Sequence, residues 1–366
     1  MKTHIISAES GERPDRAEND QRENDLMGKL TNFLGSAALA VTTASSAFAA
    51  DNLVISTWLP PSHPVNTEMF TQLTTMMAEA TDGGITTELK NGLASPPAQM
   101  DLVLDGVADI AILFHGYTPG RFVGTKLIEI PGYEGNAEAA SVAHWRVHDA
   151  MLKDLNEHRG VKVIALTTHG PGQIHSNKAV DTLADLNGLK TRLGGGVSAD
   201  VGAELGLVGI QVPAPKVYET LDSGAADAVA MNLGERISFK LNEVAKNVYE
   251  MPGGFYRGSF SVIMSQEKFD SLPADVQTAL DSKVFGETAS RMMGAVWDDS
   301  DVAARKLTLE AGDNKIVTAS AEDQAAFALI AEKVRAKIIG EVTEAGVDGQ
   351  AAYEMIVKDM AAESGN

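Results

Sequence analysis

A single arginine, Arg192, stands in surroundings that could hold a small anion. It lies in the stretch 183–200, which contains an Asn-Gly turn, a short strand over residues 189–193, three consecutive glycines and the expected start of a helix near Ser198. A guanidinium offers a planar fork to a carboxylate, a helix end offers unpaired N–H groups, and glycines let the backbone approach a ligand. The spacing predicts an anion site, although a surface arginine beside a flexible turn fits the local pattern too.

Aromatic residues follow two of the expected strands. Trp58 comes after a strand at 53–57, and Phe114 ends a nearly continuous apolar strand at 108–114, directly before His115 and Tyr117. In open α/β sheets, ligands bind at the carboxyl ends of the strands. We therefore expect these four side chains to line a pocket, with ordinary packing in the core or loops as the alternative.

Metal chemistry is poorly supported. The expected helix at 137–157 carries His144 and His148 four residues apart, which is a spacing that can bind metal. The zinc-protease motif needs glutamate directly after the first histidine, and Trp145 occupies that position. We expect a solvated helix face here and no metal site.

Catalytic motifs are also missing from the sequence. The chain has no cysteine and no Gly-x-Ser-x-Gly, and lone acids such as Glu235 and Asp200 are expected to be solvated or to cap helices. Gly194-Gly195-Gly196 fails the G-x-G-x-x-G pattern because Ala199 stands where a glycine is required. We expect no cofactor and no enzymatic activity, and a secreted hydrolase is kept as the alternative from another class of protein.

Composition narrows the range of partners. The 366 residues carry a formal net charge of -20, which argues against nucleic acid and anionic membrane surfaces as partners. An anionic ligand must then be held by local positive groups against the overall field.

The N-terminal region predicts export. Residues 27–49 have a short basic start, an apolar run at 30–44 and the cleavage pattern Ala47-Phe48-Ala49, which is typical of a secretory signal peptide. We expect cleavage near Ala49 and a periplasmic location. Residues 1–26 are polar and charged, so they are predicted to be disordered, or else translation starts at Met27 and this segment is a mis-assigned start.

The elements that must position these residues alternate between strands and helices, which indicates an α/β fold with largely parallel sheets. Residues 106–112 and 224–231 both pass from a helix end and glycine into an Asp-led apolar strand, and this internal repeat predicts two lobes. We assign residues 50–168 plus 256–295 to lobe I and 169–255 plus 296–366 to lobe II. Each lobe is expected to hold a mixed, mostly parallel sheet flanked by helices, and one long helix is expected to span both.

The order of elements from Asp51 onward resembles the extracytoplasmic solute receptors of TRAP transporters, of the DctP type. Four stretches carry the resemblance: 106–109 is similar to G-x-x-D, 176–192 to S-N-K/R…L-x-G-L-K-x-R, 217–227 to V-Y-x-A-L-x-x-G-x-V-D-G, and 272–277 to L-P-x-x-V-Q. The resemblance implies a periplasmic-binding-protein-like fold that closes on a ligand. It also implies that Arg192 binds the ligand carboxylate with a bidentate pair.

The resemblance adds three site candidates and a set of partners. Tyr218 lies in the V-Y motif, Asn232 follows the strand after it, and Gln173 follows Gly172, where some sialic-acid receptors of the family carry a second arginine. The missing arginine favours a smaller or partly apolar carboxylate over a sialate. The implied partners are a small organic acid anion and the small and large TRAP membrane subunits, which import the solute with a sodium gradient. We expect a monomer, and a receptor that senses a solute and signals is the alternative role.

Overall fold

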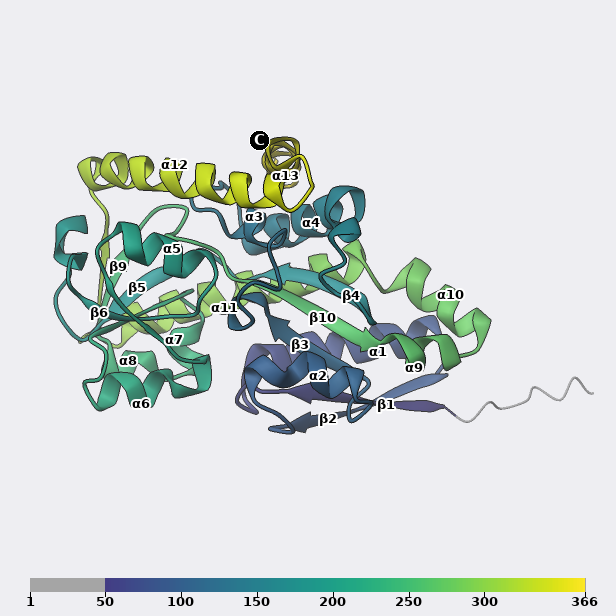
Figure 1. Ribbon diagram of the computed structural model, residues 1–366. Coiled ribbons are helices and arrows are strands. Elements are labelled where there is room, and N and C mark those ends of the chain that lie inside the picture. The colour runs from purple at the N-terminus through teal and green to yellow at the C-terminus, as the bar shows by residue number, and fades with distance from the viewer. Residues whose placement is uncertain (1–49, 366) are drawn as a thin grey trace, which may run out of the picture. The chain divides into compact units, whose positions relative to one another are not determined.

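The first of two sheets combines four strands from the N-terminal half of the chain with one strand, β10, from the C-terminal half. The computed structural model describes residues 50–365, so the predictions for residues 1–49 lie outside it. Five strands are ordered β2-β1-β3-β10-β4 (Figure 1). Their bounds are β1 (Asp51–Thr57), β2 (Ile85–Asn91), β3 (Ile110–Phe114), β4 (Val161–Thr168) and β10 (Ser259–Ser265).

The second sheet has six strands in the order β11-β9-β5-β8-β6-β7. Their bounds are β5 (Gln173–Ser176), β6 (Lys190–Leu193), β7 (Val208–Gln211), β8 (Ala228–Met231), β9 (Asn247–Glu250) and β11 (Lys315–Thr318). Across both sheets, five strand pairings are parallel and four are antiparallel. The sheets are therefore mixed, with only a slight excess of parallel pairs, and the two-lobed α/β prediction is confirmed.

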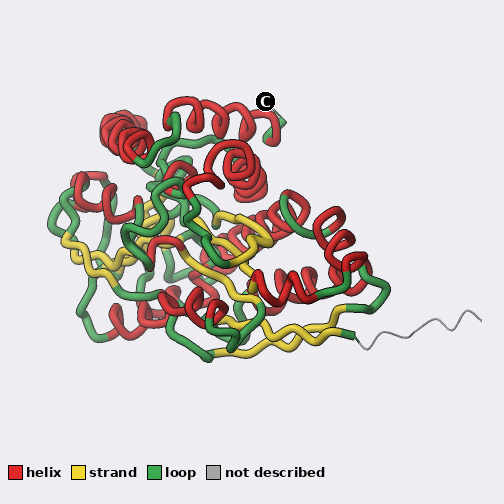
Figure 2. The backbone as a smooth tube through the Cα atoms, turned by 45° about the vertical axis from the view of Figure 1, so that its right-hand side comes forward, coloured by secondary structure: helices red, strands yellow, loops and turns green. Residues whose placement is uncertain are grey.

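Thirteen α-helices surround the sheets within residues 50–365 (Figure 2). They are α1 (Phe70–Ala80), α2 (Gln99–Leu104), α3 (Lys126–Glu129), α4 (Ala137–Val147), α5 (Val197–Glu204), α6 (Val217–Asp222), α7 (Glu235–Ser238), α8 (Leu241–Val244), α9 (Gln266–Ser271), α10 (Ala274–Lys283), α11 (Glu287–Glu310), α12 (Ala321–Glu344) and α13 (Gly349–Glu363). None of them is both long and apolar enough to cross a bilayer.

Strand β3 shows why a continuous apolar run became a central strand. All five of its residues are buried, and alternate side chains enter separate core clusters on the two faces of the sheet. Ile110 and Ile112 pack with α1, while Ala111 and Leu113 pack with α2. A strand covered on both faces has no need for polar alternation.

The chain crosses between the sheets at a segment that contains glycine and proline. Strand β4 belongs to the first sheet and β5 to the second, and the connection 169–172 lies beside a return crossing at 251–258. The two crossings are hydrogen-bonded to each other, since Gly172 N donates to Tyr256 O at 2.8 Å and Phe255 N donates to Gly172 O at 2.9 Å.

Helix α11 joins elements of both sheets, because it packs against α4 and β4 as well as α7 and β11. Helix α11 is separated from α10 at Gly286, whose φ of 85° is unfavourable for other residues. A side chain at Gly286 would also collide with the Trp145 ring. Strands β9 and β11 were not predicted from the sequence.

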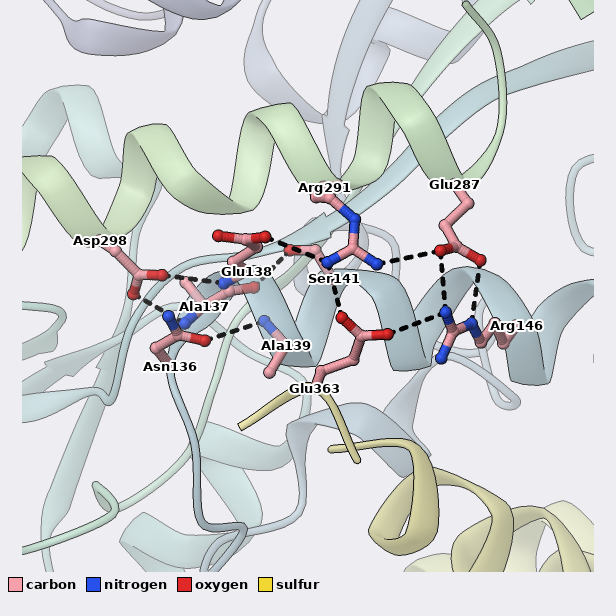
Figure 3. A network of polar contacts seen from close by, with 10 residues as sticks. All are labelled: Asn136, Ala137, Glu138, Ala139, Ser141, Arg146, Glu287, Arg291, Asp298 and Glu363. Carbon is pink, nitrogen blue, oxygen red and sulfur yellow. Dashed lines mark hydrogen bonds and ion pairs between the residues drawn. The ribbon is translucent and has the colours of Figure 1, made fainter. Parts of the chain in front are cut away.

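A polar network fastens α11 to α4 and to the C-terminal helix α13 (Figure 3). Arg291 bonds to Glu138 at 3.1 Å, Glu287 at 3.0 Å and Glu363 at 2.6 Å. Arg146 on α4 also reaches Glu287 and Glu363. The last helix of the chain therefore packs on α4, although the chain segment before it, α12, contacts α5.

The face of α4 that we expected to be solvated is buried instead. His144 is fully buried, and its ring lies 6.1 Å from the ring of His115, while His158 lies 5.5 Å from both His115 and His148. Burial lowers the pKa of all four histidines, to about 4 for His148 and about 3 for His158. Among residues 50–365, no group of three or more His, Asp or Glu side chains is arranged to hold a metal ion.

Removing the carboxylate that caps α4 should destabilise the protein. Asp298 accepts hydrogen bonds from the N–H groups of Ala137 at 2.7 Å and Glu138 at 2.9 Å. Asp298→Ala leaves these helix N-terminal donors without a partner, so we expect a loss of about 1–2 kcal/mol in the free energy of unfolding, measured by chemical denaturation. The neighbouring exposed Asp299→Ala is the control, and equal effects of the two changes would contradict the capping role.

The histidine cluster should make stability fall in acid. Histidines of the unfolded chain bind protons near pH 6.5, whereas the folded histidines have lowered pKa values. Their contribution to the free energy of unfolding is therefore fully present above pH 6.5 and declines as the pH drops toward 4. Each histidine contributes a slope of about 1.4 kcal/mol per pH unit. We expect His144→Leu to reduce the slope of unfolding free energy between pH 6.5 and 5, while Val147→Ala lowers stability without changing the slope. An unchanged slope in His144→Leu would contradict this account.

Candidate functional site

A narrow cavity lies between the two sheets. Its empty space is about 380 Å³ including the solvent at its mouth. A cavity of this size with a mostly aromatic lining suits a small ligand that carries a ring. The lining residues come from both sheets and from α7 and α11: Trp58, Leu59, Phe114, Tyr117, His169, Arg192, Gly194, Ala214, Met231, Asn232, Glu235, Phe239, Tyr256, Phe260 and Trp297.

Five of the eight residues predicted to bind ligand meet at this cavity. Trp58 follows β1, Phe114 ends β3, Arg192 lies on β6 and Asn232 follows β8, while Tyr117 lies in the turn after β3. Each sits at or just beyond the carboxyl end of a strand, where the topology of an open α/β sheet predicts a ligand site.

Arg192 is the cation of the cavity, and only 2% of its surface is exposed. Its Nε donates to Val212 O at 2.7 Å and its Nη2 donates to Tyr117 Oη at 3.2 Å. Within residues 50–365, no carboxylate oxygen lies within 4.0 Å of its guanidinium. A buried charge without a counterion is costly, and Nη1 has no hydrogen-bond partner among the described residues, so the arrangement is suited to receive an anion.

Tyr117 supplies a second donor beside Arg192. Its oxygen accepts from Ala214 N at 2.7 Å and from Arg192 Nη2, so the phenolic proton is left to point toward another acceptor. Burial raises the pKa of Tyr117, which keeps that proton in place at neutral pH. One carboxylate could therefore accept from the guanidinium and from the phenol together.

Aromatic rings form the apolar walls. Phe114 packs edge-on against Tyr117 with ring centroids 4.7 Å apart, and Trp58 packs against Tyr117 at 5.6 Å. Phe260 lies 5.1 Å from Phe114 and 5.5 Å from Trp297. Rings in contact at these distances present edges and faces to a third ring, as aromatic recognition requires.

The glycine run serves a different purpose from the one predicted. Gly194 lines the cavity, but Gly195 and Gly196 have φ values of 90° and 59°, and side chains there would collide with Gly116 and Glu129. These glycines let the loop approach elements attached to the other sheet. The N-terminus of α5 is not free for a ligand, because Val197 N donates to Glu129 at 3.0 Å. The N-cap is Gly196, not Ser198.

Three predicted site residues lie away from the cavity. His115 turns toward β10, where its ring nitrogens contact Ser259 and Ser261 at 2.9 and 3.0 Å, because it begins the turn after β3 on the face opposite Phe114. Gln173 is held by both backbone groups of Met251. Tyr218 lies near the surface on α6 and donates to Glu243 at 3.0 Å.

Several lining residues were missed in the sequence. Phe260 and Trp297 come from β10 and α11, more than 140 positions from Phe114, and His169 and Tyr256 come from the crossing segments. Glu235 was expected to be solvated or capping, but it is buried and lines the cavity. No local motif marks these positions, since tertiary structure brings them to the site: the pairing of β10 with β3 and β4 places Phe260, and the packing of α11 on β4 and α7 places Trp297 and Glu235.

Solved structures of similar shape are receptors for organic acids. A TRAP periplasmic solute-binding protein of Bordetella bronchiseptica with bound (R)- and (S)-mandelate is 32% identical, with a TM-score of 0.82, over 86% of this chain and 99% of that one. A TRAP solute-binding protein of Rhodoferax ferrireducens with copurified benzoate is 29% identical, with a TM-score of 0.81 and the same coverage.

Sequence relatives agree with this result. The chain is 25% identical over 323 residues to the outer membrane transporter protein TsaT of Comamonas testosteroni, covering 87% of this chain and 94% of that protein. The family described as bacterial extracellular solute-binding protein, family 7 (DctP), matches residues 55–341. Its members bind solutes and are not enzymes, which removes the hydrolase alternative. This chain belongs to the DctP family of extracellular solute-binding proteins.

Proposed function

We propose that this protein is a receptor for a small aromatic monocarboxylate. The observation that carries the proposal is a buried guanidinium, Arg192, without a carboxylate partner among residues 50–365, placed in a slot walled by aromatic rings. The ligands of two relatives of known structure, mandelate and benzoate, have this combination of one carboxylate and one ring. A single fixed cation fits one carboxylate, and the narrow slot fits a planar ring.

Closure of the two lobes follows from where the contacts lie. Arg192 belongs to the second sheet, whereas Trp58, Phe114 and Phe260 belong to the first. A ligand that touches both groups binds the closed form better than the open form, and this difference in affinity drives closure. Excluding water also strengthens the attraction between the guanidinium and the carboxylate.

The remaining roles are proposals that follow from the family. The closed receptor would deliver its ligand to the small and large subunits of a sodium-coupled TRAP permease. The chain would be exported with cleavage near Ala49 and would act as a monomer in the periplasm. We assign residues 50–168 and 256–295 to the first lobe and 169–255 and 296–366 to the second, as the strands of the two sheets suggest.

Arg192→Ala should abolish binding without unfolding the protein. Losing one partner of a buried, hydrogen-bonded ion pair costs about 2–5 kcal/mol, so we expect the affinity for benzoate to fall by about thirtyfold to several thousandfold in calorimetric titration. Arg192→Lys should retain only part of the wild-type affinity, because an ammonium lacks the planar fork of a guanidinium. The protein is first freed of copurified ligand by unfolding and refolding.

The melting temperature of the ligand-free variant separates a binding role from a structural one. Because the guanidinium has no counterion, its removal should leave the melting temperature unchanged or higher. Arg121→Ala, outside the cavity, is the control and should keep full affinity. Wild-type affinity in Arg192→Ala would contradict the proposal.

A further inference from the structure

We infer that Glu235 selects aromatic acids that carry a hydrogen-bond donor, a hydroxyl or an amino group, at a point away from the carboxylate. This inference rests on the proposed function and adds to it, because neither the family nor the cation at Arg192 decides what the other end of the ligand must present. Two observations support it: the hydrogen bonds that Glu235 makes, and the acceptor positions on its carboxylate that no donor fills.

Glu235 is a buried carboxylate at the start of α7, and it lines the same cavity as Arg192. Only 4% of its surface is exposed. Its contact within the described chain is His63, whose Nε2 lies 3.2 Å from each carboxylate oxygen. No lysine or arginine nitrogen of residues 50–365 lies within 4.0 Å of it.

The hydrogen bonds of His63 leave room on this carboxylate for a further donor. Val65 N–H donates to His63 Nδ1 at 3.1 Å, so Nδ1 is the nitrogen without a proton. The ring proton is then on Nε2 and is shared between the two oxygens of Glu235. Both oxygens therefore have lone pairs that no donor among the described residues fills.

A second open acceptor lies close by. Asn232 donates through Nδ2 to Asp301 at 2.7 Å, which leaves its Oδ1 buried without a partner among the described residues. Both Asn232 and Glu235 line the cavity. An unfilled buried acceptor costs free energy until a donor reaches it.

The cavity is consequently dipolar. Arg192 and Tyr117 offer donors at one part of the lining, and Glu235 and Asn232 offer acceptors at another. A plain aromatic carboxylate satisfies the cation but leaves Glu235 with the N–H of His63 as its one side-chain donor among the described residues.

The test compares ligands on the wild-type protein, so that it does not depend on a variant folding. Two matched pairs are titrated by calorimetry: 3-hydroxybenzoate against 3-fluorobenzoate, and 3-hydroxyphenylacetate against 3-fluorophenylacetate. Fluorine is close in size to a hydroxyl but donates no proton. We expect at least one donor-bearing member to bind about ten- to a hundredfold more tightly than its partner, which is the range for a hydrogen bond to a charged group. An amino group is tested in the same way with 3-aminobenzoate.

The variant Glu235→Gln then tests whether the preference for donor-bearing ligands depends on this residue. Its amide keeps the shape but loses the charge, so we expect the preference to fall below about threefold while benzoate still binds. Glu243→Gln, on the neighbouring helix α8, is the control and should keep the wild-type preference.

The outcomes separate this inference from the proposed function. The role of Glu235 would be overturned if the affinities within both pairs were equal and 3-aminobenzoate bound no more tightly than 3-fluorobenzoate. A preference that survives in Glu235→Gln would also overturn it. Either result would leave the proposed function as a receptor for aromatic acids intact. Failure of every aromatic acid to bind the wild-type protein would instead overturn the proposed function, and this inference with it.

Discussion

The structure depends on a positive charge that is buried before any anion arrives. Arg192 is held by a carbonyl oxygen and a phenol, neither of which carries the opposite charge. Burial of a lone charge opposes folding, and it persists here because β6 fixes the backbone of Arg192 and Val212 fixes its Nε. The same arrangement prepares the site, since its donors are oriented before the ligand enters and less ordering remains to oppose binding.

The fold brings elements attached to the two sheets into contact near Arg192. Glu129 on α3 accepts from Val197 at the start of α5 and from Ser259 on β10, so one buried carboxylate contacts elements of both sheets. Burial raises its pKa, while these donors oppose that rise. The glycines at 195 and 196 permit the contact, because a side chain at either position would meet backbone or carboxylate atoms. The site is thus enclosed by backbone geometry as much as by aromatic packing.

Local sequence pattern predicted much of this fold, and physical reasons explain the exceptions. Strand β3 and the first half of the α4 helix were found because their apolar residues are contiguous or periodic. Strands β9 and β11 have only four residues each, and β11 is a partly exposed edge strand, so they leave little pattern. The buried His144 was misjudged because its partners come from three other segments.

The residues of the site fall into the same two groups, those that the sequence predicts and those that it does not. Arg192, Trp58, Phe114 and Tyr117 could be predicted, because strand ends and the turns after them are where α/β sheets bind ligands. His115, next to Phe114, was misplaced because adjacent residues at a strand end face opposite directions. Trp297 and Glu235 could not be predicted, since the packing of α11 on β4 and of α7 on α11 brings them to the cavity.

One measurement tests the central claim most directly: calorimetric titration of the ligand-free protein with benzoate and with benzamide, its uncharged counterpart of the same shape. If the uncompensated guanidinium is what captures the ligand, benzoate should bind and benzamide should bind more than about a hundredfold more weakly. Equal affinities would show that the aromatic walls alone hold the ligand, and the account built on Arg192 would be wrong.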